Sequence, residues 1–366
     1  MFSSILVFIL VLSVLVLVHE LGHFLVAKRA GVMVEEFGIG IPPRVFGIKI
    51  GETTYSINLL PFGGFVRLHG ESGNKKLEIP KRAFVNKSKK IRAAIIIAGV
   101  IMNFILGVAA FSLVYSIGGI PQETGNVKVV DINSNSPAQE GGLLVGDIVR
   151  KVNDIDIGSV EQFIESVEKY KGQPVTVFVE RGGVVEKSIL TPRVNPPEGE
   201  GPLGVAITSI ETYFPPLWKR PFIGIYYGFR EAIFWGGTVV SGLVNLFSQL
   251  LSGQIPKDIA GPVGIFAITS QAAQVGAMAV INFVGILSVN LAILNILPFP
   301  ALDGGRLAFL LLESVVGKRI LPRVEGLVHT VGMIILLSLL VAITAHDIQR
   351  LIVNGGITGF IDSILR

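Results

Sequence analysis

The 366-residue sequence contains no cysteine, which excludes disulfide bonds and thiolate metal ligands. It is also poor in charge, since 16% of its residues are Asp, Glu, Lys or Arg while 50% are hydrophobic. A mean hydropathy of +0.65 agrees with this composition, which is too apolar for an ordinary soluble domain and indicates a membrane protein. Any bound metal must therefore be held by His, Asp or Glu.

The distribution of basic residues along the sequence is typical of a membrane protein and not of a protein that binds nucleic acid. The net charge is +4 and the pI is near 9.2, but Lys and Arg are not interleaved with aromatic residues along one face. Residues 28–92 contain 13 Lys and Arg against 5 Asp and Glu, whereas residues 118–210 contain 8 against 13. Because basic loops face the cytoplasm, we expect residues 28–92 inside, and the N-terminus and residues 118–210 outside, a bacterial inner membrane.

Apolar runs long enough to cross a hydrocarbon core of about 30 Å indicate four spans. They are residues 2–27, 93–115, 277–297 and 327–345. We do not expect the first run to be a signal peptide, because no basic segment precedes it and no small-residue cleavage site follows it. Residues 222–251 are also apolar but carry Arg230, Glu231, Asn245 and Gln249, so they could span or lie along the interface.

The polar stretches predict two further elements. Residues 118–210 have the strand alternation, single helical segment and size of one small α+β domain. Strand-like residues 53–60, followed by a glycine-rich segment, predict a β-hairpin. We therefore expect a polytopic α-helical membrane protein with about four transmembrane helices, a membrane-associated β-hairpin and an inserted α+β domain. The predicted divisions are residues 1–117, 118–210, an amphipathic segment 211–276, and 277–366.

The pentapeptide His19-Glu20-Leu21-Gly22-His23 ends the first apolar run. Two histidines spaced i and i+4 share a helix face, so His19 and His23 can hold one metal ion together. Zinc suits such ligands, and a catalytic zinc site keeps its fourth position for water. Glu20 is then expected to act as the base in peptide hydrolysis. Polar groups at this depth are costly unless they pair or bind something, which argues against a chance match.

The third ligand is expected from another apolar setting, the segment NILPFPALDGG at residues 295–305. Asp303 is the candidate, because the two prolines break the helix and the two glycines allow a tight turn. Irregular backbone at membrane depth is tolerated only where it lines a protein cavity. The alternative is a cytoplasmic turn with an exposed Asp303.

Membrane depth favours the ligand reading of Asp303. His19 lies about 25 Å along the first helix, in the inner part of the membrane. The third run, entering from outside, reaches the same depth near residue 297. A crossing by residues 222–251 would instead leave Asp303 on the outer side, so we read that segment as interfacial or re-entrant.

These motifs resemble the site-2 protease family of intramembrane zinc metalloproteases, and in particular its RseP-type bacterial branch, over most of the chain. The resemblance implies one zinc ion held by His19, His23 and Asp303, Glu20 as catalytic base, and Asn295 as a group that positions substrate or stabilises the oxyanion. The hairpin over residues 53–66 resembles an element that holds unwound substrate by strand addition. The substrate contacts that it implies are Phe62, Gly63, Gly64, Phe65, Asn103, Pro298 and Pro300. The sequence departs from the family at Val100, where proline is frequent.

Residues 118–210 resemble a circularly permuted PDZ domain, present once where some relatives carry two. Gly201, Leu203 and Gly204 are candidates for its carboxylate-binding loop, with a plain interdomain turn as the alternative. The domain could equally act as a size filter that excludes folded ectodomains. The resemblance implies single-pass membrane protein substrates already cut by another protease, such as anti-sigma factors or signal-peptide remnants, and no nucleic acid.

Two other classes of function compete with the protease. A non-catalytic zinc-binding scaffold with a PDZ recruitment module would need a closed site, yet only three convincing ligands are visible. A metal transporter would call for several intramembrane carboxylates along a path, and the sequence offers essentially one. Glu20→Gln separates the protease from the scaffold, because it removes the base and leaves the ligands.

Overall fold

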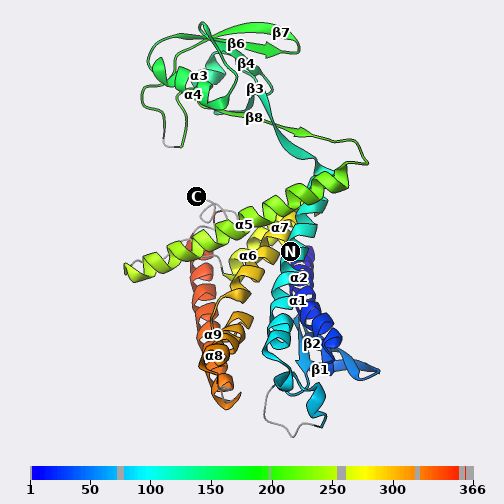
Figure 1. Cartoon of the computed structure of the whole chain (residues 1–366). Coiled ribbons are helices and arrows are strands. Elements are labelled where there is room, and N and C mark those ends of the chain that lie inside the picture. The colour runs from blue at the N-terminus through cyan, green and yellow to red at the C-terminus, as the bar shows by residue number, and fades with distance from the viewer. Residues whose placement is uncertain are drawn as a thin grey trace. The chain divides into compact units, whose positions relative to one another are not determined.

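The computed structural model describes residues 2–71, 78–197, 199–253, 261–317, 322–353 and 359 (Figure 1). The chain divides into two compact units. The first, here called the membrane unit, comprises Met1–Ile117 with Leu217–Arg366, and the second, the PDZ-like unit, comprises Gly118–Pro216. The predicted boundary at residue 210 falls inside strand β8, which continues to Tyr213 and carries the PDZ-like unit beyond it.

Five helices of the membrane unit are long and apolar enough to cross a membrane. Four of them correspond to the predicted spans: α1 (Phe2–Arg29), α2 (Lys89–Gly118), α7 (Ala277–Ile296) and α9 (Pro322–Val353). The fifth is α5 (Arg220–Leu251), the segment read above as interfacial. Figure 1 shows α5 running obliquely across one end of the other long helices, and its most apolar stretch is not buried inside the protein.

Two shorter helices of the membrane unit were not predicted. They are α6 (Pro262–Val275) and α8 (Asp303–Val316). The α6 helix packs antiparallel to α1: Ser270 Oγ donates to Ser4 Oγ at 2.9 Å, while the rings of Phe266 and Phe8 meet edge to face at 5.5 Å.

Glycine and serine let the helices approach closely, as is usual where lipid supplies no hydrophobic driving force. A Cβ at Gly22 of α1 would lie 2.3 Å from the Ala98 carbonyl oxygen of α2. At Gly107 of α2 it would lie 2.6 Å from Val289 of α7, and at Gly228 of α5 it would lie 2.4 Å from Ser112 of α2. These contacts fix α2 at the centre of the unit.

The predicted hairpin is longer than expected. Its strands, β1 (Val34–Ile50) and β2 (Thr53–Leu68), turn at residues 51–52. Residues 34–39 pair on one side with residues 54–57 and on the other with residues 64–68, while residues 44–50 pair with residues 53–58. The two bent strands thus form four adjacent segments in the order 44–50, 53–60, 34–41 and 64–68. The first two and the last two segments pair antiparallel, whereas residues 36–39 and 54–57, in the two central segments, run in the same direction. Residues 64–68 form one edge of this sheet.

A buried carboxylate helps to hold these segments together. Glu36 is 3% exposed and accepts a hydrogen bond from Ser56 Oγ at 2.7 Å. It also pairs with Arg44 at 2.8 Å and with Arg67 at 3.1 Å. Because Arg44 and Arg67 lie on the two outer segments, Glu36 ties both edges to the centre of the sheet.

The PDZ-like unit is a sheet with strand order β7-β6-β4-β3-β8, and β5 pairs with β4. Apolar residues of alternate strand positions, with Phe163 and Val167 of a helix, form its core. Its elements are β3 (Ile120–Ile132), α3 (Pro137–Glu140), β4 (Ile148–Val152), β5 (Ile155–Asp156), α4 (Val160–Lys169), β6 (Val175–Arg181), β7 (Val184–Leu190) and β8 (Val205–Tyr213).

Candidate metal centre and active site

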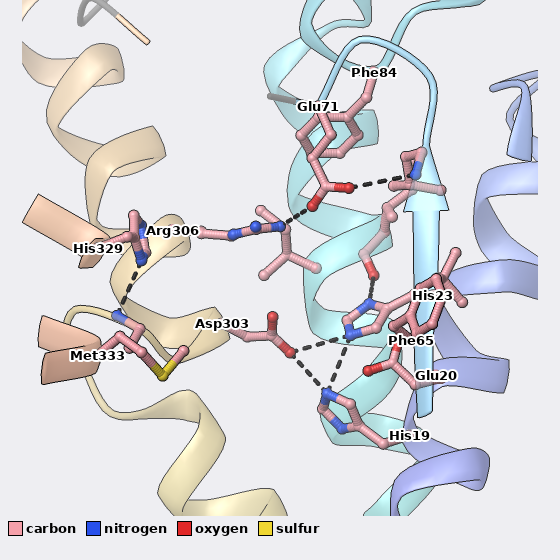
Figure 2. A pocket seen from close by; sticks show the side chains of 15 residues that line it. His19, Glu20, His23, Phe65, Glu71, Phe84, Asp303, Arg306, His329 and Met333 are labelled. Carbon is pink, nitrogen blue, oxygen red and sulfur yellow. Dashed lines mark hydrogen bonds and ion pairs between the residues drawn. The ribbon is translucent and has the colours of Figure 1, made fainter. Parts of the chain in front are cut away.

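His19 and His23 occupy successive turns of one face of α1 (Figure 2). Their Nε2 atoms lie 3.1 Å apart, and the two rings meet nearly perpendicular, with an interplanar angle of 85°. His19 is buried and His23 is partly buried. The i, i+4 spacing therefore directs both imidazoles to one point, as the sequence predicts.

Asp303 reaches that point from α8. Its Oδ2 lies 3.0 Å from Nε2 of His19 and 3.1 Å from Nε2 of His23. The prediction that Gly304 and Gly305 form a tight turn after Asp303 is wrong, because both are helical residues of α8. A Cβ at Gly304 would lie 2.1 Å from the Leu297 carbonyl oxygen, and one at Gly305 would lie 2.4 Å from that of Phe299. The glycines thus allow the first turn of α8 to pack on the chain that precedes it.

These three ligand atoms form a nearly equilateral triangle with edges of 3.0–3.1 Å. A tetrahedral zinc ion with bonds of about 2.0–2.1 Å has ligand-to-ligand edges of about 3.3 Å, so the triangle fits such an ion. Asp303 Oδ2 is buried and receives a hydrogen bond from neither imidazole, which leaves a carboxylate oxygen without a donor. Two imidazoles and one carboxylate are ligands that zinc accepts in catalytic sites.

Glu20 lies beside the triangle in a cavity of about 280 Å³. One wall of this cavity comes from the edge segment of β2, of which Phe65, Val66 and Leu68 line the cavity. A Cβ added at Gly64 would lie 3.9 Å from Cγ of Glu20, so the edge segment runs close to this carboxylate. The edge segment therefore lies beside the same cavity as Glu20 and the proposed ligands.

The opposite wall is fixed by contacts that the sequence did not predict. Arg306, one turn after Asp303, forms an ion pair with Glu71 at the end of β2. The backbone N–H of Ala301 donates to Nδ1 of His329 in α9 at 3.0 Å. Figure 2 shows both contacts among the side chains that line the cavity. They anchor the segment that carries Asp303 to β2 on one side and to α9 on the other.

Other residues predicted at the site are not among those that line the cavity. Asn295 is half-buried in the last turn of α7 and is not among the residues that line the cavity, and neither are Pro298 and Pro300. Pro300 packs instead against α9, where a Cβ at Gly332 would lie 2.3 Å from it. Gly63 has a φ of +84°, which favours glycine, and the side chain of Phe62 lies outside the described part of the structure.

Asn103 does not lie where a substrate could touch it. Its side chain is 0% exposed and does not line the cavity, although it was predicted among the substrate contacts. It lies behind His19 instead, with Nδ2 placed 3.3 Å from Nδ1 of that ring. This position argues against direct substrate contact and for a role through the histidine.

The candidate carboxylate-binding loop of the PDZ-like unit is partly engaged in internal contacts. Leu203 is 2% exposed and belongs to the core. The N–H of Gly204 donates to the carbonyl of Gly201 at 2.9 Å, which closes a turn. That N–H is therefore not free to bind a peptide carboxylate, and the loop fits the alternative of a structural turn better at this position.

Comparison with known proteins gives a family for the chain. A protein of Clostridium acetobutylicum, named only as a candidate zinc metalloprotease, is 36% identical, with 95% of this chain and 98% of the relative covered. Zinc metalloprotease RasP of Oceanobacillus iheyensis is 31% identical, and the regulator of sigma-W protease RasP of Bacillus subtilis is 29% identical, each with 95% of this chain and 99% of the relative covered.

Among solved structures, the PDZ domain of an SdrC-like protein from Listeria monocytogenes covers 23% of this chain and 88% of its own, with 20% identity and a TM-score of 0.21. The model of peptidase family M50 matches residues 7–339. This match extends across both the histidine pair and the aspartate segment. The chain therefore belongs to peptidase family M50.

Proposed function

We propose that the protein is an intramembrane zinc metalloendopeptidase that hydrolyses a peptide bond in or beside the transmembrane segment of a single-pass membrane protein. The observation that carries the proposal is the triangle of His19, His23 and Asp303 with Glu20 beside it. Near-full-length relatives that are named zinc metalloproteases support it. In the proposed site one zinc ion is held by the two imidazoles and the aspartate, with a fourth position left for water.

A bound zinc ion would supply Lewis acidity toward the scissile carbonyl and make water acidic enough to be deprotonated near neutral pH. The carboxylate of Glu20 takes that proton and delivers it to the nitrogen of the leaving amine. Phe84, Ile95 and Ile96 form an apolar part of the lining of the cavity around Glu20. Asn295, at the end of α7, is proposed to hold the substrate chain or the oxyanion once substrate is bound.

The edge segment of β2 supplies the proposed means of holding substrate. Residues 64–68 pair with residues 34–39 on one side, and three of them, Phe65, Val66 and Leu68, line the cavity. An unwound substrate added along this edge would satisfy its backbone through main-chain hydrogen bonds with little dependence on sequence. A transmembrane helix hides its carbonyls in intrahelical hydrogen bonds, so helix-weakening residues near the cleaved bond should favour cleavage.

The helix directions support the proposed topology. His19 lies in the C-terminal half of α1, and Asp303 follows the C-terminal end of α7. For the two residues to meet, α1 and α7 must run in the same direction. The α6 helix, with 14 residues, is about 21 Å long and too short for a full crossing. It returns antiparallel to α1, and its end lies beside Ser4. We therefore place α5 along the interface, the N-terminus and the PDZ-like unit outside the cytoplasm, and residues 28–92 inside.

The PDZ-like unit has two outer strands, β7 and β8. Of these, β8 pairs with β3 and contacts α4. A peptide could be added to this edge, or the unit could exclude substrates with large ectodomains. Either role suits substrates that another protease has already shortened, which we propose as the physiological class.

The test compares wild-type protein with Glu20→Gln, coexpressed with a truncated single-pass reporter. Glu140→Gln, an exposed change in the PDZ-like unit, is the matched control. We expect a membrane-released fragment from wild type and Glu140→Gln but not from Glu20→Gln, with equal zinc content in all three. Equal cleavage by Glu20→Gln would contradict the assigned base, and no cleavage by any of them would favour the zinc-binding scaffold.

A further inference from the structure

One face of α2 contacts both histidines of the candidate metal centre. Ile95, Gly99 and Asn103 are spaced by four residues and therefore lie one above the other on the helix. Ile95 contacts His23, Asn103 contacts His19, and Gly99 lies between the two rings. Through Ile95 and Asn103, this face of α2 thus reaches the Nδ1 atoms of the two proposed ligands, on the side away from the metal.

The contact of Ile95 fixes the tautomer of His23. Nδ1 of His23 lies 2.7 Å from the Ile95 carbonyl oxygen, which can only accept a hydrogen bond. Nδ1 must therefore carry the hydrogen, and Nε2 of the neutral ring keeps its lone pair. That lone pair points to the triangle, as a metal ligand requires.

His19 needs the same tautomer but has no carbonyl at its Nδ1. Among the described residues, its partner there is the side chain of Asn103, with an amide end at 3.3 Å. If the NH2 group of Asn103 donated to Nδ1, the hydrogen of neutral His19 would lie on Nε2 and block the metal.

The two ends of a carboxamide have nearly the same shape, so Asn103 can turn its oxygen to His19 in the same space. We propose that Asn103 is a positioning residue: its Oδ1 accepts a hydrogen bond from Nδ1–H of His19 and so directs Nε2 of His19 to the metal. This inference rests on the proposed zinc site. It assigns to Asn103 the same task that the Ile95 carbonyl performs for His23.

The decisive pair of variants is Asn103→Leu and Asn103→Asp. Leucine keeps the approximate size but cannot accept a hydrogen bond, whereas an ionised aspartate can only accept one. Ser288→Ala is the matched control, because Ser288 Oγ donates to the backbone oxygen of Asn103 at 2.8 Å and does not touch the histidine. All are full-length proteins purified in detergent.

Zinc affinity is measured by competition with a chelator, and the ligand geometry by the visible spectrum of the cobalt-substituted protein. Loss of a hydrogen-bond partner behind a metal-binding histidine weakens affinity about 10–100-fold, which we expect for Asn103→Leu. Asn103→Asp should stay within a few-fold of wild type and keep its cobalt spectrum, and Ser288→Ala should not differ. Wild-type affinity in Asn103→Leu, or an equal loss in Asn103→Asp, would overturn the proposal.

If Asn103→Leu does not fold, nitrogen NMR of histidine-labelled wild-type protein gives the answer directly. A hydrogen on Nδ1 of His19 in the zinc-bound protein is expected, with a chemical shift that responds to Asn103→Asp. A response at His23 alone would refute the assignment. Failure of the proposed protease would be distinguishable, since wild type would then bind no zinc or Glu20→Gln would still cleave.

Discussion

Gly99 of α2 is the position at which one methyl group should disable the metal centre. In the interior of an exposed helix, Gly→Ala is favourable by about 1 kcal/mol, because alanine is the better helix former. At Gly99, however, the added Cβ would lie 2.5 Å from Nε2 of His23 and 2.7 Å from Cε1 of His19. The substitution therefore sets a small gain in helix propensity against a collision with both proposed ligands.

The size of the collision can be compared with what a zinc site tolerates. Ordinary contact begins at 3.4 Å, so the 2.5 Å approach requires a displacement of about 0.9 Å. Zinc-ligand distances vary by about 0.2 Å in functional sites, which is a quarter or less of that displacement. The histidine rings cannot absorb the shift and stay in place, so we expect zinc affinity to fall by on the order of 100-fold or more.

Two glycines of the same helix provide controls for Gly99→Ala. A Cβ at Gly107 would meet Val289 of α7 at 2.6 Å, so Gly107→Ala strains helix packing without touching a ligand. At Gly118 nothing lies within 4 Å, and Gly118→Ala should be neutral. Zinc competition and thermal unfolding are measured on all three purified variants. If Gly99→Ala binds zinc as tightly as Gly118→Ala, the close approach of α2 to the histidines is refuted.

Three further predictions concern the surroundings of the site. Asp347→Leu removes the carboxylate that accepts hydrogen bonds from the backbone N–H groups of Gly261 and Gly264 at the buried start of α6. The free energy of unfolding should fall by about 1–3 kcal/mol, because two buried donors lose their acceptor. The measurement is the Tm, which should be lower for Asp347→Leu than for Asp347→Asn. Gly228→Leu should drive α5 from α2, because a Cβ added at Gly228 would lie 2.4 Å from Ser112. Trp235 fluorescence, measured in a Trp218→Phe background, should then shift red. Hydrogen bonds from Arg82 and Lys28 hold the pKa of Glu52 at about 2, below its ordinary value of 4.5. The stability that ionised Glu52 gives to the hairpin is complete above pH 4.5 and is lost as pH falls toward 2. Hydrogen exchange in the hairpin should therefore quicken over that window in wild type but not in Glu52→Gln.

Local patterns explain what the sequence predicts well. The helices α1, α2, α7 and α9 follow from uninterrupted hydropathy, and the pairing of His19 with His23 follows from helical spacing. The meeting of Asp303 with the histidines follows from equal depth in the membrane. Each inference needs only residues within one segment and the thickness of the bilayer.

Features that depend on distant partners were missed. Residues 38–43 contain two glycines and two prolines and look like a loop, yet they belong to β1 because residues 34–41 pair with β2 on both sides. Gly304 and Gly305 suggest a turn, but the backbone of residues 296–299 leaves no room for a side chain there. The sequence marks Asn103 as a polar residue in a span and gives no sign that His19 is its neighbour.

The metal centre joins two parts of the membrane unit that are anchored separately. His19 and His23 are placed by α1 and α2, through the close approach of Gly22 to Ala98 and the support of Ile95. Asp303 is placed by the packing of Gly304 on residue 297 and by the contact of Ala301 with α9. Three lone pairs brought to 3.0–3.1 Å by independent supports repel one another unless a cation lies between them. Helix packing, rather than mutual attraction of the ligands, therefore creates the site, and zinc affinity should depend on the supporting glycines as strongly as on the ligands themselves.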